Sequence, residues 1–274
     1  MNAATLPTNG VAGVASLLIP VKALVVTASS VEGLAWLLNI NVTSQVAVPG
    51  LPAGSPSVSC NAVGVCVVIT GMGHANSAAS LAAVVWSRLF DLTRAYVLVT
   101  GIAGVDPMRA TIGGATWARY AVDFGLQWEL DARDAPSNWS GGYLGVNTKS
   151  PDEVPTPLYG TEMYRLNETL LQAALSLSRN ATLVDSADAQ RYRALYAAGS
   201  PGALPPAVVQ CDVASGDTWW SGTLLGARAR AWVALLTGGA GVYCAAEQET
   251  TAVSARATSA DAPGRVASCV RRDN

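Results

Sequence analysis

The sequence predicts an α/β fold in which a largely parallel sheet is buried between helices. Two β-branched runs, Val65–Ile69 and Tyr96–Val99, are each followed by a Thr-Gly step. A helical pattern lies between them, so strand, helix and strand alternate as in a βαβ unit. Only 13% of the 274 residues are charged and 50% are hydrophobic, which fits strands that are covered on both faces.

The first half of the chain divides into short, well-marked elements. Residues 21–27 form an apolar run and are predicted to be a buried strand. A helix is expected to follow through residue 38, because Ser29 and Glu32 have the spacing of a capping box. Residues 41–57 are rich in Pro and Gly and are expected to form a loop.

Cysteine usage bears on the compartment. Cys60 and Cys66 flank a predicted turn, so the sequence is consistent both with a hairpin disulfide and with two reduced thiols in the core. Sequons begin at Asn41, Asn138, Asn167 and Asn180 and favour a cell-surface or secreted location. Residues 1–21 carry no Lys or Arg and so lack the basic flank of a signal peptide.

The second half continues the alternation of strands and helices around one long loop. A helix over residues 77–90 precedes the second Thr-Gly strand. Beyond that strand the patterns predict a strand within 116–130, a surface loop over 131–157, helices over 162–178 and 185–198, a linker over 199–206, a strand over 208–213, a helix over 222–237 and a strand over 241–244.

No linker divides the chain, so we expect a single domain over residues 21–255. A loose leader would occupy residues 1–20 and an irregular tail residues 256–274. Residues 33–87 lack charge, but Pro, Asn and Gly interrupt them, so no membrane-spanning segment is predicted. A net charge of −2 without basic clusters argues against nucleic acid as a partner. A single histidine and no cysteine motif argue against a zinc site or a histidine-rich metal cluster, so no cofactor is expected.

The two Thr-Gly steps are the best candidates for a ligand site. Where a strand turns into a helix N-terminus, unpaired backbone N–H groups and the helix dipole favour a negative or hydroxyl-rich ligand. Two such crevices side by side at one edge of a sheet would hold a small ligand. The residues concerned are Gly71, Gly73 and His74 at the first step and Thr100, Gly101, Ala103 and Gly104 at the second. The glycines could instead serve turn geometry alone.

A set of motifs then makes the chain resemble a known family. The motifs are Val21–Val26 with Glu32 after it, Thr70–Asn76, Thr100–Gly104, Trp117–Asp123, Cys211-Asp212 with Ser215–Thr218, and Tyr243-Cys244 ahead of Gln248-Glu249. Together they resemble the fungal purine nucleoside permease family, which is related to the nucleoside phosphorylases and nucleosidases. The resemblance spans residues 20–255 and implies a three-layer αβα sandwich with a mixed central sheet.

The resemblance also implies roles for four acidic residues. Glu247 and Glu249 look like the ribose-binding Glu-Met-Glu step, in which a carboxylate grips the two sugar hydroxyls. Glu32 matches an acid that positions the attacking water in the nucleosidases, although its place in a capping box is a sufficient reason for a glutamate there. Asp217 could bind the ligand or cap the helix that follows it.

Other polar and aromatic side chains leave alternatives open. His74 could donate or accept one hydrogen bond to a sugar or phosphate, or could simply cap a helix. Trp219 and Trp220 could stack on a purine, but consecutive residues point in opposite directions on a strand, so at least one is expected in the core. Arg119 and Arg228 are conceivable phosphate ligands, with ordinary structural roles as the alternative.

Three functions are consistent with these residues. The first is purine nucleoside recognition linked to uptake, in a non-spanning binding domain. The second is cleavage of the N-glycosidic bond by water or phosphate, with phosphate as an optional co-substrate. Relatives continue past Gln248-Glu249 with a strand and an acidic or amide loop, and residues 261–274 do not match that pattern, so the chain is expected to be truncated there and the base-protonating acid to be missing. The third, a dinucleotide-dependent oxidoreductase, lacks the third glycine of its motif. The sequence leaves the oligomeric state open.

Overall fold

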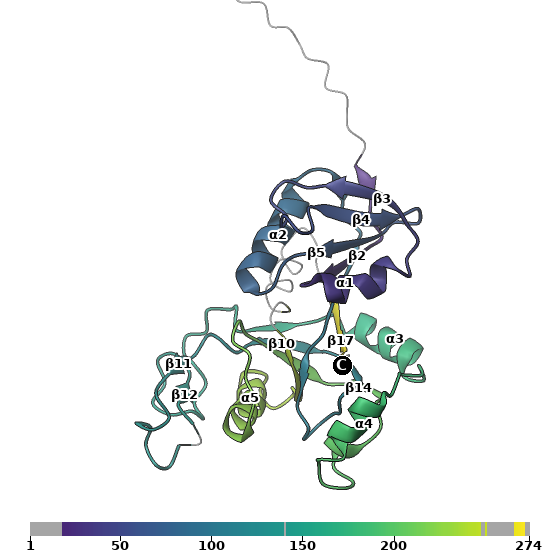
Figure 1. Cartoon of the computed structure of the whole chain (residues 1–274). Coiled ribbons are helices and arrows are strands. Elements are labelled where there is room, and N and C mark those ends of the chain that lie inside the picture. The colour runs from purple at the N-terminus through teal and green to yellow at the C-terminus, as the bar shows by residue number, and fades with distance from the viewer. Residues whose placement is uncertain (1–17, 140, 248–249, 251–265, 272–274) are drawn as a thin grey trace, which may run out of the picture.

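Two mixed sheets with helices packed on them form the body of the protein (Figure 1). The computed structural model describes residues 18–139, 141–247, 250 and 266–271, the last six by their backbone. The larger sheet has eight strands in the order β14 (Val208–Gln210), β9 (Ala115–Trp117), β17 (Val266–Arg271), β7 (Tyr96–Gly101), β2 (Ala23–Thr27), β5 (Val65–Ile69), β4 (Ser57–Asn61) and β3 (Val42–Ala47). The α/β fold with mixed sheets is therefore confirmed.

The second sheet has five strands. Its order is β13 (Met163–Arg165), β10 (Tyr120–Asp123), β15 (Asp212–Ser215), β16 (Tyr243–Glu247) and β8 (Gly104–Val105). Two short pairs complete the strands, β1 (Ile19–Pro20) with β6 (Phe90–Asp91) and β11 (Trp128–Glu129) with β12 (Tyr143–Leu144). The helices are α1 (Ser30–Leu37), α2 (His74–Trp86), α3 (Glu168–Ser178), α4 (Ala187–Arg193) and α5 (Thr223–Leu236), with a 3₁₀ turn at Pro201–Ala203.

The chain passes from one large sheet to the other at three short bends. β7 continues into β8, β9 into β10, and β14 into β15, each across one or two residues. Ala103, Ala118 and Cys211 lie at these bends and belong to the same buried cluster. Because small side chains occupy the bends, the two sheets can close on a shared apolar core.

Helices α1 and α2 cover opposite faces of the larger sheet, as a three-layer fold requires. Leu81 and Val84 of α2 belong to the same core cluster as Val68 of β5. On the other face, a Cβ on Gly33 of α1 would lie 2.9 Å from the side chain of Ile69. Since consecutive strand residues point to opposite faces, the two helices sandwich β5. Helix α5 packs on the five-stranded sheet through Trp232.

The two Thr-Gly strands are not immediate neighbours. β2 lies between β5 and β7 and pairs with both in parallel. All three strands therefore end at one edge of the sheet, but the end of β2 separates the two Thr-Gly steps. The expectation that the steps lie side by side is corrected to this extent.

Several predicted boundaries were wrong for identifiable reasons. Residues 42–47, expected in a loop, form the edge strand β3, whose exposed polar positions and neighbouring Pro and Gly hid the pattern. Residues 163–165, expected in a helix, pair with β10, and α3 starts only after the Asn167 side chain accepts from the Leu170 N–H. The strand expected within 116–130 is divided into β9, β10 and β11.

Both expected terminal segments contain strand. Ile19 and Pro20, placed in the leader, pair with Phe90 and Asp91. Residues 266–271, placed in an irregular tail, form β17 between β7 and β9. β17 satisfies backbone groups of both neighbours, which explains why a segment with weak local signals becomes a strand.

Disulfides join neighbouring strands in both large sheets. Cys60 and Cys66 face each other across β4 and β5, with their Cα atoms 4.1 Å apart, so the hairpin bridge is confirmed. A second bridge, Cys211–Cys244, ties the start of β15 to β16 and was not predicted. Among the residues that the structure describes, none of the helices is both long and apolar enough to cross a bilayer.

Candidate functional site

The carboxyl ends of parallel strands from both sheets converge on the predicted site. β2, β5 and β7 end at Thr27, Ile69 and Gly101 in the larger sheet. In the smaller sheet β10, β15 and β16 are parallel, and their register aligns Asp123, Ser215 and Glu247 in one row. Open α/β sheets bind ligands at this edge, so polar side chains gathered there are site candidates.

Glu32 performs its capping role and also reaches the second Thr-Gly step. Its Oε2 accepts from the N–H groups of Ala28 (2.9 Å) and Ser29 (2.8 Å), and the Ser29 hydroxyl accepts from the Glu32 N–H in return. Its Oε1 accepts from the N–H of Ile102 at 2.9 Å. The carboxylate therefore links the start of α1 to the end of β7, and the two alternatives for Glu32 do not exclude each other.

Gly101 allows two carboxylates to approach the same point. A Cβ at this position would lie 2.9 Å from Oε1 of Glu32 and 3.4 Å from Oε1 of Glu247. Glu247 is only 3% exposed, and its Oε2 accepts from the N–H (2.8 Å) and the hydroxyl of Thr250. Carboxylates can accept hydrogen bonds from vicinal hydroxyls. Glu249, the other predicted sugar ligand, lies outside the described residues.

The remaining glycines differ in whether their backbone conformation requires glycine. Gly71 and Gly73 have φ of +84° and +90°, so the turn itself favours glycine at both. Gly104 sits in β8 opposite Ala246, with ordinary room for a Cβ. Thr100 pairs with Cys269 within the sheet, and Ala103 is buried at the bend to β8. Of these, the turn at Gly71–Gly73 and the backbone after Gly101 face the converging strand ends.

His74 and Asp217 form a pair across the two sheets. Asp217 Oδ1 accepts from the backbone N–H of His74 at 2.8 Å and lies 2.9 Å from Nδ1 of its ring. Asp217 thus caps α2, whereas the helix that follows it in sequence, α5, has Gly222 as its N-cap. Burial raises the pKa of Asp217, but the hydrogen bonds and charge of His74 outweigh it, so the pKa lies below its usual value.

Asp123 is a third titratable group at this place, and the sequence analysis did not single it out. It ends β10, and its Oδ1 accepts from the N–H groups of Gly125 (2.6 Å) and Leu126 (3.1 Å). Burial raises its pKa, only partly offset by those hydrogen bonds and by the nearby His74. A sequence signal existed, because Asp123 is the last residue of a strand-like motif and a carboxylate at that position faces the ligand edge.

The aromatic and basic candidates have separate outcomes. Trp220 stacks on Phe124 with ring centroids 4.3 Å apart, which is the expected core role for one of the two tryptophans, while Trp219 is 72% exposed. Arg119 forms a bidentate pair with Glu168. Arg228 lies over the ring of Trp232 and donates to Gln127. Both arginines thus have structural partners.

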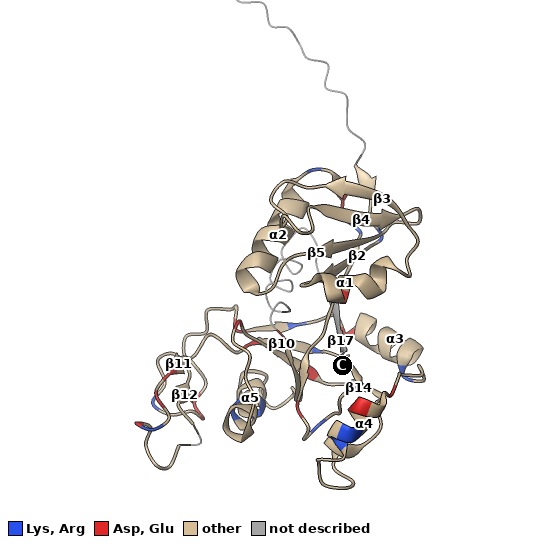
Figure 2. Cartoon of the chain, in the orientation of Figure 1, with Lys and Arg blue, Asp and Glu red and all other residues tan. Residues whose placement is uncertain are grey.

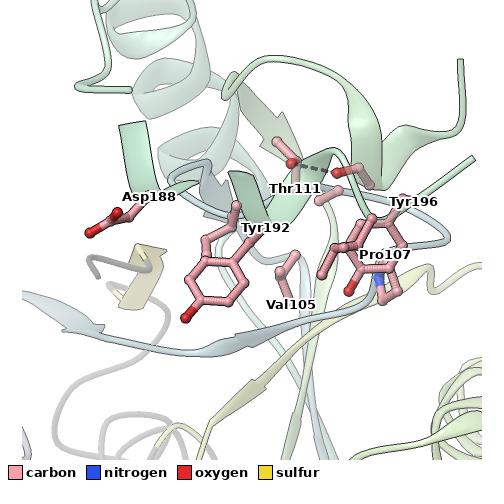
Figure 3. Close-up of a pocket in the computed structure, with 10 residues that line it drawn as sticks. Val105, Pro107, Thr111, Asp188, Tyr192 and Tyr196 are labelled. Atoms are coloured by element: carbon pink, nitrogen blue, oxygen red, sulfur yellow. Dashed lines mark hydrogen bonds between the residues drawn. The ribbon is translucent and has the colours of Figure 1, made fainter. Parts of the chain in front are cut away.

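Two cavities lie beyond the converging strands, along the segment that follows β8. One, of about 740 Å³, is bordered by Tyr192 and Tyr196 of the α4 region and by Val105, as Figure 3 shows. The other, of about 540 Å³, includes Gly104 and the ion pair of Asp106 with Arg230. In the part of the chain that the structure covers, no three His, Cys, Asp or Glu side chains gather to hold a metal ion. Figure 2 shows that the basic and acidic residues are dispersed along the helices and strands that the structure describes.

Comparison with known sequences identifies one family. The family model for purine nucleoside permease (NUP) matches residues 20–269. A purine nucleoside permease of Candida albicans is 34% identical over 236 residues, which are 84% of this chain and 58% of that protein. A probable purine nucleoside permease of Schizosaccharomyces pombe is 35% identical over 256 residues, covering 89% of this chain and 73% of that one. The chain thus spans little more than half the length of the Candida relative.

Comparison with solved structures identifies the fold. The 5′-methylthioadenosine/S-adenosylhomocysteine nucleosidase of Campylobacter jejuni matches with a TM-score of 0.58 and 15% identity, over 93% of this chain and 86% of that one. A futalosine hydrolase mutant of Helicobacter pylori matches with a TM-score of 0.56 and 14% identity, over 92% and 89% of the two chains. At these identities the likeness establishes the nucleosidase-like fold that the motifs predicted, and nothing finer.

Proposed function

This chain belongs to the purine nucleoside permease family, and from that premise we propose that it recognises purine nucleosides in the course of their uptake. The observation that carries the proposal is the pair of carboxylates, Glu32 and Glu247, that approach one point beside Gly101 at the carboxyl ends of the strands. Glu32 comes from α1, which covers the larger sheet, and Glu247 from β16 of the smaller sheet.

The chemistry of that edge suits a nucleoside. A carboxylate accepts two hydrogen bonds from adjacent hydroxyls, which a ribose diol supplies. In the proposal, Glu247, with Glu249 beside it in sequence, holds the diol. Glu32 and the N–H groups after Gly101 line the same edge. Trp219 offers an exposed aromatic face two residues from Asp217, which suits a flat base.

A second candidate function is cleavage of the N-glycosidic bond. The nucleosidase-like fold favours it, as does Glu32, whose carboxylate stands at the site edge where it could orient a water. Cleavage also requires stabilisation of an oxocarbenium-like sugar and of the leaving base. Phosphate as co-substrate would make the reaction phosphorolysis.

One experiment separates the candidates. Purified full chain is titrated calorimetrically with inosine, adenosine and guanosine, with and without phosphate, while release of free base is followed by chromatography. Recognition alone gives saturable binding without base, hydrolysis gives base without phosphate, and phosphorolysis gives base only with phosphate. Absence of saturable binding to all three nucleosides would contradict the proposal.

Variants test the assigned site in the same assay. We expect Glu247→Gln and Glu249→Ala to weaken binding at least tenfold, because a charged acceptor for the diol is lost. Glu129→Gln is the matched control, since Glu129 is an exposed acid in β11. Wild-type affinity in both site variants would contradict the assignment.

A further inference from the structure

We propose that Asp123 contacts the nucleoside directly and accepts a hydrogen bond from an O–H or N–H group at the end of the ligand away from the ribose diol. This inference rests on the proposed nucleoside site and adds a third recognition group to it. Its basis is the placement of Asp123 in the smaller sheet and the state of its second oxygen.

The register of three parallel strands places Asp123 and Glu247 on the same face. Ala121, Val213 and Ala245 form one row across β10, β15 and β16, and all three are buried in the apolar core. Two residues further along each strand, the aligned row is Asp123, Ser215 and Glu247. Residues two apart on a strand share a face, so this polar row lies directly beyond the core. The polar row therefore begins where the strands reach the ligand edge.

The spacing of the row matches two ends of one ligand. Neighbouring strands lie about 4.8 Å apart, so two strand spacings separate Asp123 from Glu247 by about 10 Å. That separation leaves room for a nucleoside between the two carboxylates, each of which reaches from its strand toward the ligand. If Glu247 holds the diol, Asp123 stands at the opposite end.

The carboxylate of Asp123 has one oxygen engaged and one available. Oδ1 accepts both backbone N–H groups of the turn that follows β10. No hydrogen bond reaches Oδ2 from the residues that the structure describes. Oδ2 is not fully buried, so water reaches it, and a ligand O–H or N–H can take the place of that water.

The groups around Asp123 leave its second oxygen to a ligand. His74 at the start of α2, Asp217 in the loop after β15 and Tyr164 in β13 lie close enough to interact electrostatically with it. The C=O of Glu162 accepts from the backbone N–H of Asp123. Asp217 accepts from both the backbone and the ring of His74, so that pair is mutually occupied. Glu162 is bound to the N–H groups of Tyr159, Gly160 and Thr161.

The test uses Asp123→Asn in the full chain. The amide oxygen of asparagine can keep both backbone hydrogen bonds of the turn, while its NH₂ group replaces the available acceptor with a donor. We expect inosine affinity to fall 10- to 100-fold in calorimetry, as for other charged acceptors, with an unchanged thermal midpoint. Glu129→Gln is again the matched acid control, because Glu129 is an exposed acid in β11 and lies outside the candidate site.

Ligand analogues identify the donor that Asp123 accepts from. If it is the 5′-hydroxyl, 5′-deoxyinosine binds wild type more weakly than inosine does, and Asp123→Asn costs nothing further. If it is N1–H of the base, 1-methylinosine behaves in that way and 5′-deoxyinosine still loses affinity in the variant. Either pattern supports the inference.

The failures are distinguishable. Wild-type inosine affinity in Asp123→Asn, together with weakened binding in Glu247→Gln, would overturn the role of Asp123 and leave the nucleoside site standing. A wild-type chain that binds no nucleoside would overturn the proposed function, and the role of Asp123 with it. A variant that loses affinity and also melts early would count against a direct contact, because the turn would then carry the effect.

Discussion

At the scale of single residues, the candidate site depends on acidic side chains that cap helices and also lie at the edge where the ligand would bind. Glu32 closes a capping box with Ser29 and also accepts from the Ile102 N–H, which lies in a different strand connection. Asp217 caps α2 from the other sheet. Because each acid is already held by backbone donors, its orientation is fixed before any ligand arrives.

Gly101 is the residue whose replacement tests this arrangement most sharply. In Gly101→Ala the new Cβ would lie 2.9 Å from Glu32 Oε1, so the carboxylate must move away from Ile102. We expect a loss of about 1–3 kcal/mol in the free energy of unfolding, measured by urea denaturation, and weaker nucleoside binding. Gly104→Ala is the control, since its Cβ would lie 3.7 Å from Ala246 and should be tolerated. Equal effects of the two substitutions would refute this account.

Asp217 gives a prediction with a sign in pH. In the folded state the pKa of Asp217 is below its usual value because His74 donates to it. The ionised carboxylate therefore stabilises the fold at pH values above its ordinary pKa of 3.8, and this stabilisation is lost as the pH falls through the lowered pKa. Asp217→Ala should cost about 1 kcal/mol at neutral pH through the lost cap of α2. Thermal melts from pH 2 to 7 check this: the gap between wild type and variant should close at the acid end, and a constant gap would speak against it.

At the scale of elements, the two disulfides brace the strands that carry the site. Cys66 lies in β5 ahead of the Gly71–Gly73 turn, and Cys211–Cys244 joins the strands that lead to Asp217 and Glu247. Each bridge therefore fixes the approach of a strand whose end contributes to the candidate site.

The lengths of the closed loops rank the two bridges. The residues of Cys60–Cys66 are 6 apart and those of Cys211–Cys244 are 33 apart. Chain-entropy arguments assign about 2 kcal/mol to the shorter loop and about 4 kcal/mol to the longer one. Urea denaturation of the two double-alanine variants, Cys60→Ala with Cys66→Ala and Cys211→Ala with Cys244→Ala, should reproduce that order. The reverse order would show that strain or residual structure outweighs loop length.

Which elements could be predicted follows from how local their signals are. The capping box at Ser29 and Glu32 and the Cys60–Cys66 hairpin are complete within a few residues, and both are present. β17 and the Asp123 row depend on partners far along the chain, so no local pattern marks them. Glu32 illustrates the boundary: its cap was readable in sequence, but its bond to Ile102 required the fold.

At the scale of the whole molecule, two sheets connected by three bends enclose one core and bring their strand ends together. The ligand edge combines Glu32 of α1 and His74 of α2, the helices that cover the larger sheet, with Asp123 and Glu247 of the smaller sheet and Asp217 of the loop after β15. A ligand held at this edge would connect the two sheets, and binding would stabilise the molecule as a unit.

Ligand binding should therefore raise the stability of the entire fold. A nucleoside at 100 times its dissociation constant adds about 2.7 kcal/mol by mass action. Differential scanning calorimetry with increasing inosine should show a single transition that moves to higher temperature. Free ribose at the same concentrations is the control, and a shift confined to part of a split transition would contradict coupling through both sheets.

The position of β17 has a consequence for how the protein is made. Residues 266–271 insert between β7 and β9, so during translation the strands on either side wait for a segment synthesised about 150 residues after β9. Until that segment leaves the ribosome, the sheet exists as two fragments with open edges that invite pairing with other nascent chains. The need for chaperones should thus persist until residues 266–271 have emerged and paired.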